Sequence, residues 1–413
     1  MLPQRVRARE QHLTLVCEVP EECALGQPGP LGDLRHRGLL VAALDVELQR
    51  RLRETAARVR LPSTHAPDPT WMTVTDIGAN LMTVTDMPSP ERVPAWRATN
   101  RLEYVMRVFV TGASGWIGSA VVPELIGAGH EVVGLARSDA SAAALARAGA
   151  QVRRGTLDDL GTLRDAAAAS DGVIHLAFKH DIAFSGDFQG AADADRRAVE
   201  TFGEVLAGSD RPFVLASGIL GLTPGRVVTE RDGRDSAADA SHDDGPRARQ
   251  ATAHRTLDLA SHGVRSSVLR LPPTVYGEGD HGFMAALVGI ARDRGVSGYV
   301  GDGSNRWPGV HRLDAAHLFR LALEKAPAGS VLHAVTDEGV AIRTVAEVIG
   351  RHLGLPAVSI PGEEAGAHFS WLGGMIGLDA PASSALTREL LGWQPVQPGL
   401  VDDLDKGHYF RAK

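Results

Sequence analysis

Three glycines spaced three residues apart constrain this chain more than any other feature. They lie in Thr111-Gly-Ala-Ser-Gly115-Trp-Ile-Gly118, between an apolar run at 107–111 and a helical pattern at 116–128. Glycine lets the backbone turn sharply and come close to a pyrophosphate, and the helix that follows offers unpaired N–H groups to an anion. The strand–turn–helix context therefore predicts a dinucleotide-binding unit, with a purely structural turn as the alternative.

Strands and helices alternate from Met106 to Leu271. We expect strands at 107–111, 131–136, 151–154, 172–177, 212–216 and 266–271, and helices at 116–128, 140–147, 160–169, 191–207 and 247–261. Continuous apolar strands in such an alternation are typical of a parallel sheet with helices on both faces. The pattern becomes irregular after Pro272. We therefore expect an α/β fold: a doubly wound parallel Rossmann sheet over 106–272 and a smaller C-terminal α/β substrate domain over 273–413.

The first 105 residues do not continue this alternation of strands and helices. One helix is expected at 41–61, and a pentapeptide recurs at 72–76 and 82–86, among Pro- and Gly-rich pieces in which we see no strand alternation. We expect Met106 to be the natural start and residues 1–105 to be translated upstream sequence. A poorly ordered N-terminal arm is the alternative, and N-terminal mass spectrometry of the native protein distinguishes the two.

Composition excludes several classes of protein. A net charge of −7 argues against general nucleic-acid binding, and no stretch approaches the ~20 apolar residues of a membrane span. The N-terminus does not resemble a signal peptide, and both cysteines, Cys17 and Cys23, precede Met106. Residues 106–413 thus need no oxidising compartment, and their histidines lack metal-ligand spacing. We expect a cytoplasmic protein with a small-molecule substrate and no metal, and leave a homodimer open.

Motifs beyond the glycine turn narrow the unit further. They are Thr156-Leu-Asp158, Val173-Ile-His-Leu-Ala177, Arg270-Leu-Pro-Pro-Thr-Val-Tyr-Gly277, Gly301-Asp-Gly-Ser-Asn-Arg306, Val310-His-Arg-Leu-Asp314 and Leu391-Gly-Trp-Gln-Pro395. With them, residues 106–413 resemble the extended short-chain dehydrogenase/reductase superfamily, of the NAD-dependent epimerase/dehydratase type. The resemblance implies an oxidoreductase that transfers hydride between a nicotinamide and a carbonyl or alcohol carbon. A nucleotide-sugar epimerase or dehydratase, and a non-catalytic NADP(H)-binding regulator, are the alternatives.

The resemblance also implies a set of cofactor-binding residues. Those expected around the pyrophosphate, at the adenine and along the groove are Gly112, Ser114, Gly115, Trp116, Ile117, Gly118, Leu157, Asp158, Ala177 and Phe178. Arg137 stands at the end of the second strand, where an acid would bind a ribose 2′-hydroxyl. A guanidinium suits a 2′-phosphate instead, so we predict NADP, with NAD as the alternative if Asp139 reaches the ribose.

The catalytic apparatus is incomplete when compared with the family. Its members use a serine together with a tyrosine and a lysine four residues further on. Ser217, after the fifth strand, matches the serine, but the other two positions fall near Pro246 and Gln250. The chain has only four lysines, Lys179, Lys325, Lys406 and Lys413. We therefore expect an altered proton relay.

One segment, Tyr409-Phe-Arg-Ala-Lys413, has the missing spacing, but it lies at the extreme C-terminus. A docked or frayed tail is the better interpretation there.

Other side chains are candidates to replace the relay. Lys179 and His180 follow the fourth strand, at the edge where such sheets place ligands, and His180 is expected to titrate near neutrality. Arg247 or Arg249 is a candidate to substitute electrostatically for the lysine. Each is also an ordinary type of surface or packing residue.

Two residues are expected to contact the substrate. Tyr276 is a candidate to face the pocket, although the matching tyrosine of the family is usually structural. Arg306 fits the arginine that contacts a substrate phosphate in nucleotide-sugar members, because a guanidinium binds phosphate through two hydrogen bonds.

Overall fold

The computed structural model describes residues 105–220, 222, 225–233 and 246–411, together with four N-terminal strands. The chain divides into two compact units, 1–102 and 103–413. The helix expected at 41–61 lies outside the described residues.

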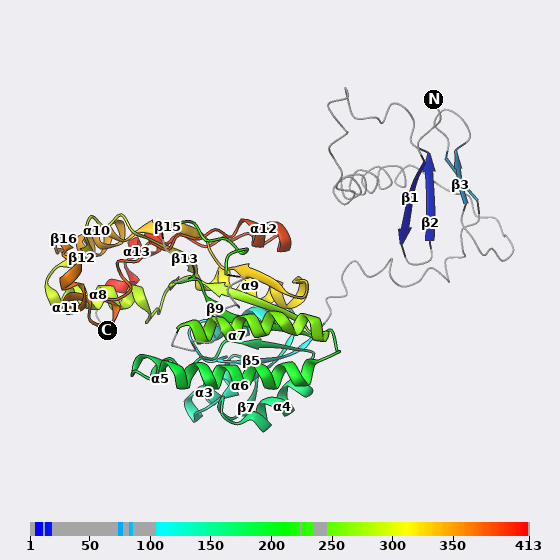
Figure 1. Ribbon diagram of the computed structural model, residues 1–413, viewed down its shortest axis with the longest axis horizontal. Helices are drawn as coiled ribbons and strands as arrows, with labels where there is room; N and C mark the ends of the chain where they lie inside the picture. The colour runs from blue at the N-terminus through cyan, green and yellow to red at the C-terminus, as the bar shows by residue number, and fades with distance from the viewer. Residues whose placement is uncertain are drawn as a thin grey trace. The chain divides into compact units, whose positions relative to one another are not determined.

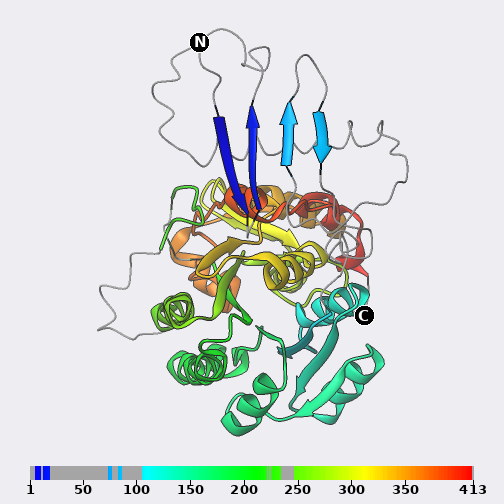
Figure 2. The ribbon, with the colours of Figure 1, turned by 90° about the vertical axis from the view of Figure 1, so that its right-hand side faces the viewer.

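The N-terminal unit contains two antiparallel strand pairs (Figure 2). Strand β1 (Arg5–Glu10) pairs with β2 (Leu13–Glu18), and β3 (Thr73–Asp76) pairs with β4 (Met82–Thr85). Our reading of this segment as lacking strand alternation is therefore wrong. The two copies of the pentapeptide pair with each other, because their alternating threonines and valine have high β propensity.

A seven-stranded parallel sheet forms the centre of the second unit (Figure 1). Its strands, in sheet order, are β14 (Ser330–His333), β10 (Arg265–Leu271), β9 (Pro212–Gly218), β8 (Gly172–His175), β5 (Arg107–Thr111), β6 (Glu131–Ala136) and β7 (Gln151–Arg154). Strand order reverses between β5 and β8, and that is where open α/β sheets bind ligands. The doubly wound Rossmann fold predicted from the sequence is confirmed. Its seventh strand comes from beyond residue 272 and is short, so the sequence pattern did not indicate it.

Helices cover both faces of this sheet because successive residues of a buried strand point to opposite sides. Val108 and Val110 of β5 join one core cluster, and Phe109 between them joins the other. The first cluster packs against α2 (Gly118–Gly127), α3 (Asp139–Arg147) and α9 (Arg312–Lys325). The second packs against α4 (Leu160–Ala168), α6 (Phe188–Leu206) and α7 (Pro246–Asp258). A short helix, α5 (His180–Phe184), follows β8 and leads into α6.

The remaining C-terminal elements form a separate apolar core (Figure 1). Two small sheets are present, one of β11 (Thr274–Tyr276), β13 (Arg306–His311) and β15 (Asp337–Ala341), the other of β12 (Ser297–Val300) and β16 (Ala357–Ile360). The helices of this core are α8 (Phe283–Arg294), α10 (Ile342–Leu353), α11 (Ala365–Phe369) and α13 (Leu400–Asp405). Helix α12 (Ala385–Leu391) instead packs against β14 and α9, and its Leu391 joins the first core cluster of the central sheet. This part therefore has α/β character, as expected.

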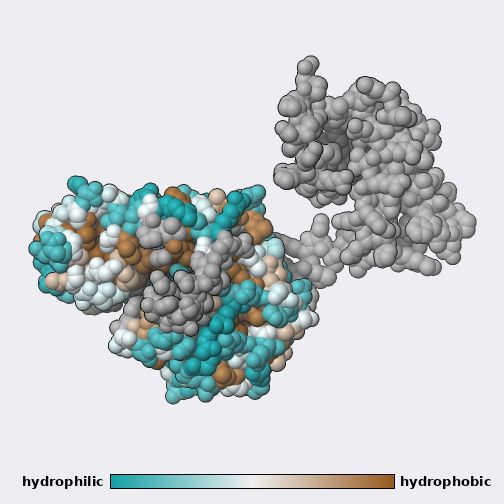
Figure 3. All heavy atoms as spheres, in the orientation of Figure 1, coloured by the Kyte–Doolittle hydropathy of each residue, from teal (hydrophilic) through white to brown (hydrophobic). Residues whose placement is uncertain are grey.

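Helices α6 and α7 present hydrophilic residues on the face that Figure 3 shows. Ion pairs join Glu200 to Arg196 within α6 and to Arg255 of α7. Within the described ranges, no helix is long and apolar enough to cross a bilayer.

Candidate cofactor and catalytic site

The glycine turn between β5 and α2 is packed too tightly for side chains. Gly112 has a φ of +64°, and a Cβ on it would lie 2.7 Å from the backbone nitrogen of Ala177. A Cβ on Gly118 would lie 2.7 Å from the carbonyl carbon of Ala113. The turn therefore requires glycine at both positions, because the backbone segments touch each other directly.

This turn offers unpaired backbone donors. Gly115 donates its N–H to the Gly112 carbonyl at 2.9 Å, which closes the turn. The N–H groups of Ser114, Trp116 and Ile117 make no hydrogen bond to any described residue. They lie just before the first turn of α2, where the helix dipole favours negative charge. The turn can therefore hold a pyrophosphate through backbone donors alone.

Two arginines lie at the ends of the neighbouring strands β6 and β7. Arg137 pairs with Asp181 of α5 at 3.2 Å, and its side chain is 69% exposed. Arg154, at the end of the neighbouring β7, pairs with Asp139 at 2.7 Å and also donates to the carbonyl of Ser138. Both guanidiniums are on the surface and suit a 2′-phosphate. Sequence reasoning missed Arg154, because only the pairing of β6 with β7 brings it to this point.

Lys179 contacts a residue expected at the adenine. Its ammonium lies 2.8 Å and 2.7 Å from the two carboxylate oxygens of Asp158. Leu157, beside Asp158, is buried in the core. This ion pair uses the hydrogen-bonding capacity of Lys179 on the cofactor side of the site, so the structure does not favour a role for it in the proton relay.

A buried polar chain runs beneath the turn. His175, at the end of β8, bonds Thr111 Oγ1 through Nδ1 at 2.5 Å and Asp195 of α6 through Nε2 at 3.1 Å. Thr111 Oγ1 in turn accepts the N–H of Ala177 at 3.3 Å. His175 and Asp195 are 1% and 2% exposed, so each satisfies a group that would otherwise be buried without a partner.

Phe178 is the centre of an aromatic and cationic cluster. The Arg249 guanidinium of α7 lies over its ring, 4.1 Å from the centroid. The ring centroids of His180 and Phe188 lie 5.0 Å and 5.6 Å from it. The structure thus brings together Arg249, which the sequence offered only as a substitute for the lysine, and two predicted residues.

His180 does not titrate near neutrality in this arrangement, contrary to our expectation. Removal from water beside Phe178, followed by the positive charge of Arg249, lowers its pKa to about 4. The ring is therefore neutral at neutral pH, since both effects oppose the charged form. A neutral imidazole with so low a pKa is a poor proton donor.

Ser217 lies at the carboxyl end of β9 and is 6% exposed. It stands opposite Arg270 of β10 in the parallel register. It lies at the same edge of the sheet as the residues that follow β8, but within β9 rather than after it, because this strand extends to Gly218. Helix α7 packs against this strand and carries neither tyrosine nor lysine.

The structure does not bring Tyr276 to a pocket surface. Its side chain is fully buried, and its hydroxyl donates to Asp337 at 2.8 Å and lies 3.0 Å from the Pro398 carbonyl. Burial, together with the Asp337 carboxylate, raises the pKa of Tyr276. The expectation that Tyr276 contacts substrate is therefore wrong for this structure, because its hydroxyl joins segments of the C-terminal part.

Arg306 is likewise held by a protein group. Its Nε and Nη2 lie 3.0 Å and 2.9 Å from the two carboxylate oxygens of Asp379. This two-point pairing occupies the face of the guanidinium that a substrate phosphate would need. In this structure Arg306 ties β13 to the segment around Asp379, so the predicted phosphate contact is not supported.

Tyr409, the tyrosine of the C-terminal Tyr-x-x-x-Lys spacing, is docked. Its hydroxyl donates to Asp280 at 2.9 Å and accepts the N–H of Gly277 at 3.2 Å. Burial and the Asp280 carboxylate raise its pKa. The interpretation of this segment as a docked tail is confirmed.

Comparison with known proteins adds the family to this geometry. The NAD dependent epimerase/dehydratase family model matches residues 108–334. The chain belongs to this family. An uncharacterized protein of Schizosaccharomyces pombe is 47% identical over 305 residues, which cover 74% of this chain and all of that protein.

One curated protein and one solved structure are more distantly similar to this chain. Sterol-4-alpha-carboxylate 3-dehydrogenase (decarboxylating) of Dictyostelium discoideum is 26% identical over 243 residues, 57% of this chain and 73% of that protein. The structure of UDP-glucose 4-epimerase from Thermotoga maritima covers 74% of this chain and 98% of its own at a TM-score of 0.58. It is 21% identical, so it supports the fold alone.

The functional residues that sequence reasoning missed have partners that lie far from them in the chain. His175 lies within a quoted family motif, but its partner Asp195 is separated from it by twenty positions. Asp195 had a detectable signal, since it is an acid on an otherwise apolar helix face with Ala191, Ala194 and Ala198. An acid on a buried face needs a partner, which predicts a buried polar pair.

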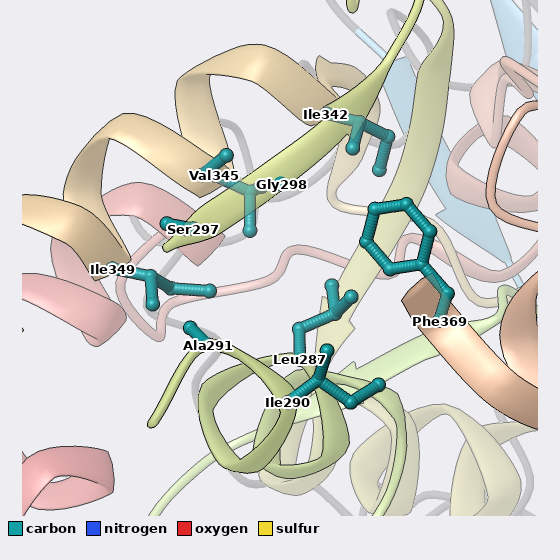
Figure 4. Close-up of a pocket in the computed structure, with 10 residues that line it drawn as sticks. Leu287, Ile290, Ala291, Ser297, Gly298, Ile342, Val345, Ile349 and Phe369 are labelled. Carbon is teal, nitrogen blue, oxygen red and sulfur yellow. The ribbon is translucent and has the colours of Figure 1, made fainter. Parts of the chain in front are cut away.

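A recess in the C-terminal part does not add to this site. Figure 4 shows its lining, which comes from α8, β12, α10 and α11 and includes Leu287, Ile342, Val345, Ile349 and Phe369. The lining is almost entirely hydrocarbon, so it offers no acid, base or cofactor ligand. No cluster of metal-ligating side chains is present among the residues that the structure describes.

Proposed function

We propose that this chain is an NADP-dependent oxidoreductase of the extended short-chain type. It transfers hydride between the nicotinamide and a carbonyl or alcohol carbon of a small molecule. The observation that carries the proposal is the combination of two anion-binding features at one edge of the sheet. These are the unpaired N–H groups of the glycine turn and the guanidiniums of Arg137 and Arg154.

The residues present fit such a cofactor. The turn has glycine where the backbone segments come closest, and three of its N–H groups make no hydrogen bond to a described residue and could bind a pyrophosphate. The 2′-phosphate would lie between Arg137 and Arg154, displacing their exchangeable surface partners Asp181 and Asp139. Asp158, Ala177 and Phe178 would line the rest of the cofactor site.

Few side chains would take part in the reaction at the nicotinamide end of the cofactor. The cofactor would supply or accept the hydride. Ser217 hydrogen-bonds the substrate oxygen and orients it, and the proton that this oxygen gains in a reduction comes from water by way of the Ser217 hydroxyl. Phe178 and Phe188 exclude water from one side of the reacting carbon. Lys179 acts in cofactor binding rather than in proton transfer, and its contact with Asp158 supports this role.

A fluorescence titration of the full chain with NADPH and NADH tests the cofactor assignment. We expect tighter binding of NADPH, and we expect Arg137→Met to weaken NADPH roughly 10-fold while leaving NADH unchanged, because a charge-assisted phosphate contact contributes about 1.5 kcal/mol. Arg164→Met, which removes an exposed guanidinium of α4, is the control. Equal affinity for the two cofactors in the unmodified protein would contradict NADP.

A screen of carbonyl compounds for NADPH oxidation tests the enzyme. Turnover that falls in Ser217→Ala supports the assigned role of Ser217. NADPH binding without turnover across the panel would instead favour a regulatory protein, a function that the absence of tyrosine and lysine from α7 also favours. Nucleotide-sugar chemistry is the weaker alternative, since Asp379 occupies Arg306.

A further inference from the structure

Arg249 differs from three basic residues that the structure describes near the carboxyl edge of the sheet. Arg137, Lys179 and Arg197 each have a carboxylate within 4.0 Å, from Asp181 or Asp158. No described acid lies within that distance of Arg249, whose nearest electrostatic partner is the more distant Asp195. Its guanidinium makes no hydrogen bond to a described residue, and its Nε is buried.

This arrangement is costly for the ligand-free protein. Burial lowers the pKa of Arg249, which shows that its environment disfavours the charge. Asp195 compensates only in part, because its carboxylate forms no ion pair with Arg249. A guanidinium stays charged at any physiological pH, so an anion bound beside it would relieve the cost.

The position of Arg249 says where such an anion would lie. The guanidinium lies over the ring of Phe178, which follows β8 at the edge where open α/β sheets place their ligands. This contact leaves the N–H groups of Arg249, including the buried Nε, available for hydrogen bonds. The N–H groups of a guanidinium match the two oxygens of a carboxylate.

We propose that Arg249 binds a carboxylate of the substrate, so that the substrate class is an oxo acid or hydroxy acid rather than a neutral carbonyl compound. This inference rests on the proposed function, because it takes the groove beside Phe178 as the place where the substrate binds. Arg249 binds and orients the acid, while Ser217 contacts the oxygen that changes its oxidation state.

A matched pair of probes tests this inference. Phenylglyoxylate carries a carboxylate beside a ketone, and its methyl ester has the same shape without the charge. Both are titrated calorimetrically into the full chain saturated with NADP⁺, which cannot reduce them. We expect the unmodified protein to prefer the acid, and Arg249→Met to lose roughly 10- to 100-fold in affinity for the acid and little for the ester.

Two further variants keep the result interpretable. Arg255→Met removes an exposed arginine of the same helix and should leave the preference intact. Arg249→Lys keeps the positive charge but lacks the planar guanidinium, so it should retain only part of the preference for the acid. In addition, the melting temperature of Arg249→Met without ligand should equal or exceed that of the unmodified protein, since a charge without a carboxylate partner among the described residues is replaced by an apolar chain of similar length.

The outcomes separate this inference from the proposed function. An unmodified protein that does not distinguish the acid from the ester, or an Arg249→Met variant that keeps the preference, would overturn the carboxylate assignment. A clear loss of stability in Arg249→Met would do the same, because it would show that Arg249 is a structural anchor. Failure of NADP⁺ to bind counts against the proposed function instead, and the two probes are then compared on the protein alone.

Discussion

The turn before α2 and the cluster beside α7 border the same functional edge but are built differently. The turn uses backbone groups of consecutive residues, from Gly112 to Gly118. The cluster uses side chains from separate segments, with Phe178 after β8, His180 on α5, Phe188 on α6 and Arg249 on α7. A backbone site tolerates changes of side chain around it, whereas a side-chain cluster changes its chemistry with a single substitution. The turn accordingly keeps its backbone donors and its glycines here, whereas helix α7 carries neither tyrosine nor lysine.

Substitution in the turn should have the largest effect. We expect Gly118→Ala to lower the free energy of unfolding by about 2 kcal/mol or more and to abolish NADP(H) binding, because its Cβ would overlap the Ala113 backbone. Urea unfolding and cofactor fluorescence measure the two effects. Gly127→Ala, at the other end of α2 with open space around it, should instead stabilise by about 0.5–1 kcal/mol. Similar behaviour of the two variants would refute the packing argument.

Substitution in the buried His175–Asp195 pair should have the second-largest effect. We expect Asp195→Ala to lower the free energy of unfolding by about 2–3 kcal/mol, because it leaves His175 Nε2 buried without its partner. Chemical denaturation measures the change. Asp193→Ala removes a surface acid of the same helix that pairs with Arg196 at 3.6 Å, and should cost less than about 0.5 kcal/mol. An equally small effect at Asp195 would show that the pair is dispensable.

Substitution of Arg154 tests the side-chain contacts proposed for the 2′-phosphate. Arg154→Met should reduce the preference for NADPH over NADH about fivefold, the factor that about 1 kcal/mol from one exposed ion pair gives. The ratio of the two dissociation constants measures it. Arg153→Met, at the adjacent position with Asp165 as its partner, should leave the ratio unchanged. An unchanged ratio in Arg154→Met would leave Arg137 as the residue responsible for the preference.

The smallest effect expected is a change in the titration of His180. The pKa of His180 is lowered to about 4, first by removal from water and then by Arg249. Arg249→Met removes a positive charge, so the pKa should rise towards the ordinary value of 6.5, which NMR titration of the ring detects. The neutral ring favours folding fully above pH 6.5, and this contribution is lost as the pH falls towards 4. A pKa that does not move in Arg249→Met would place the guanidinium away from His180.

Prediction from the sequence worked for short apolar runs between turn signals, although it missed the local strand signal of the repeated pentapeptide. The strands at 107–111, 131–136 and 151–154 were predicted with the bounds that the structure shows, since each is a short run between turn signals. It failed where a partner decides the role of a side chain. Tyr276 and Arg306 have the right chemical type for substrate contacts, but Asp337 and Asp379 are dozens of positions away in the chain and satisfy them internally.

The sequence by itself determined the doubly wound sheet, the glycine turn and the absence of tyrosine and lysine from α7. These follow from periodicity, from the conformational freedom of glycine and from residue identity, all of which are local. Only the tertiary structure decided which charges are neutralised. It paired Lys179 with Asp158 and Arg306 with Asp379, and it left Arg249 stacked on Phe178 without a carboxylate among the described residues. The physical reason is that neutralisation requires charges to approach within a few ångströms, and folding alone sets those distances.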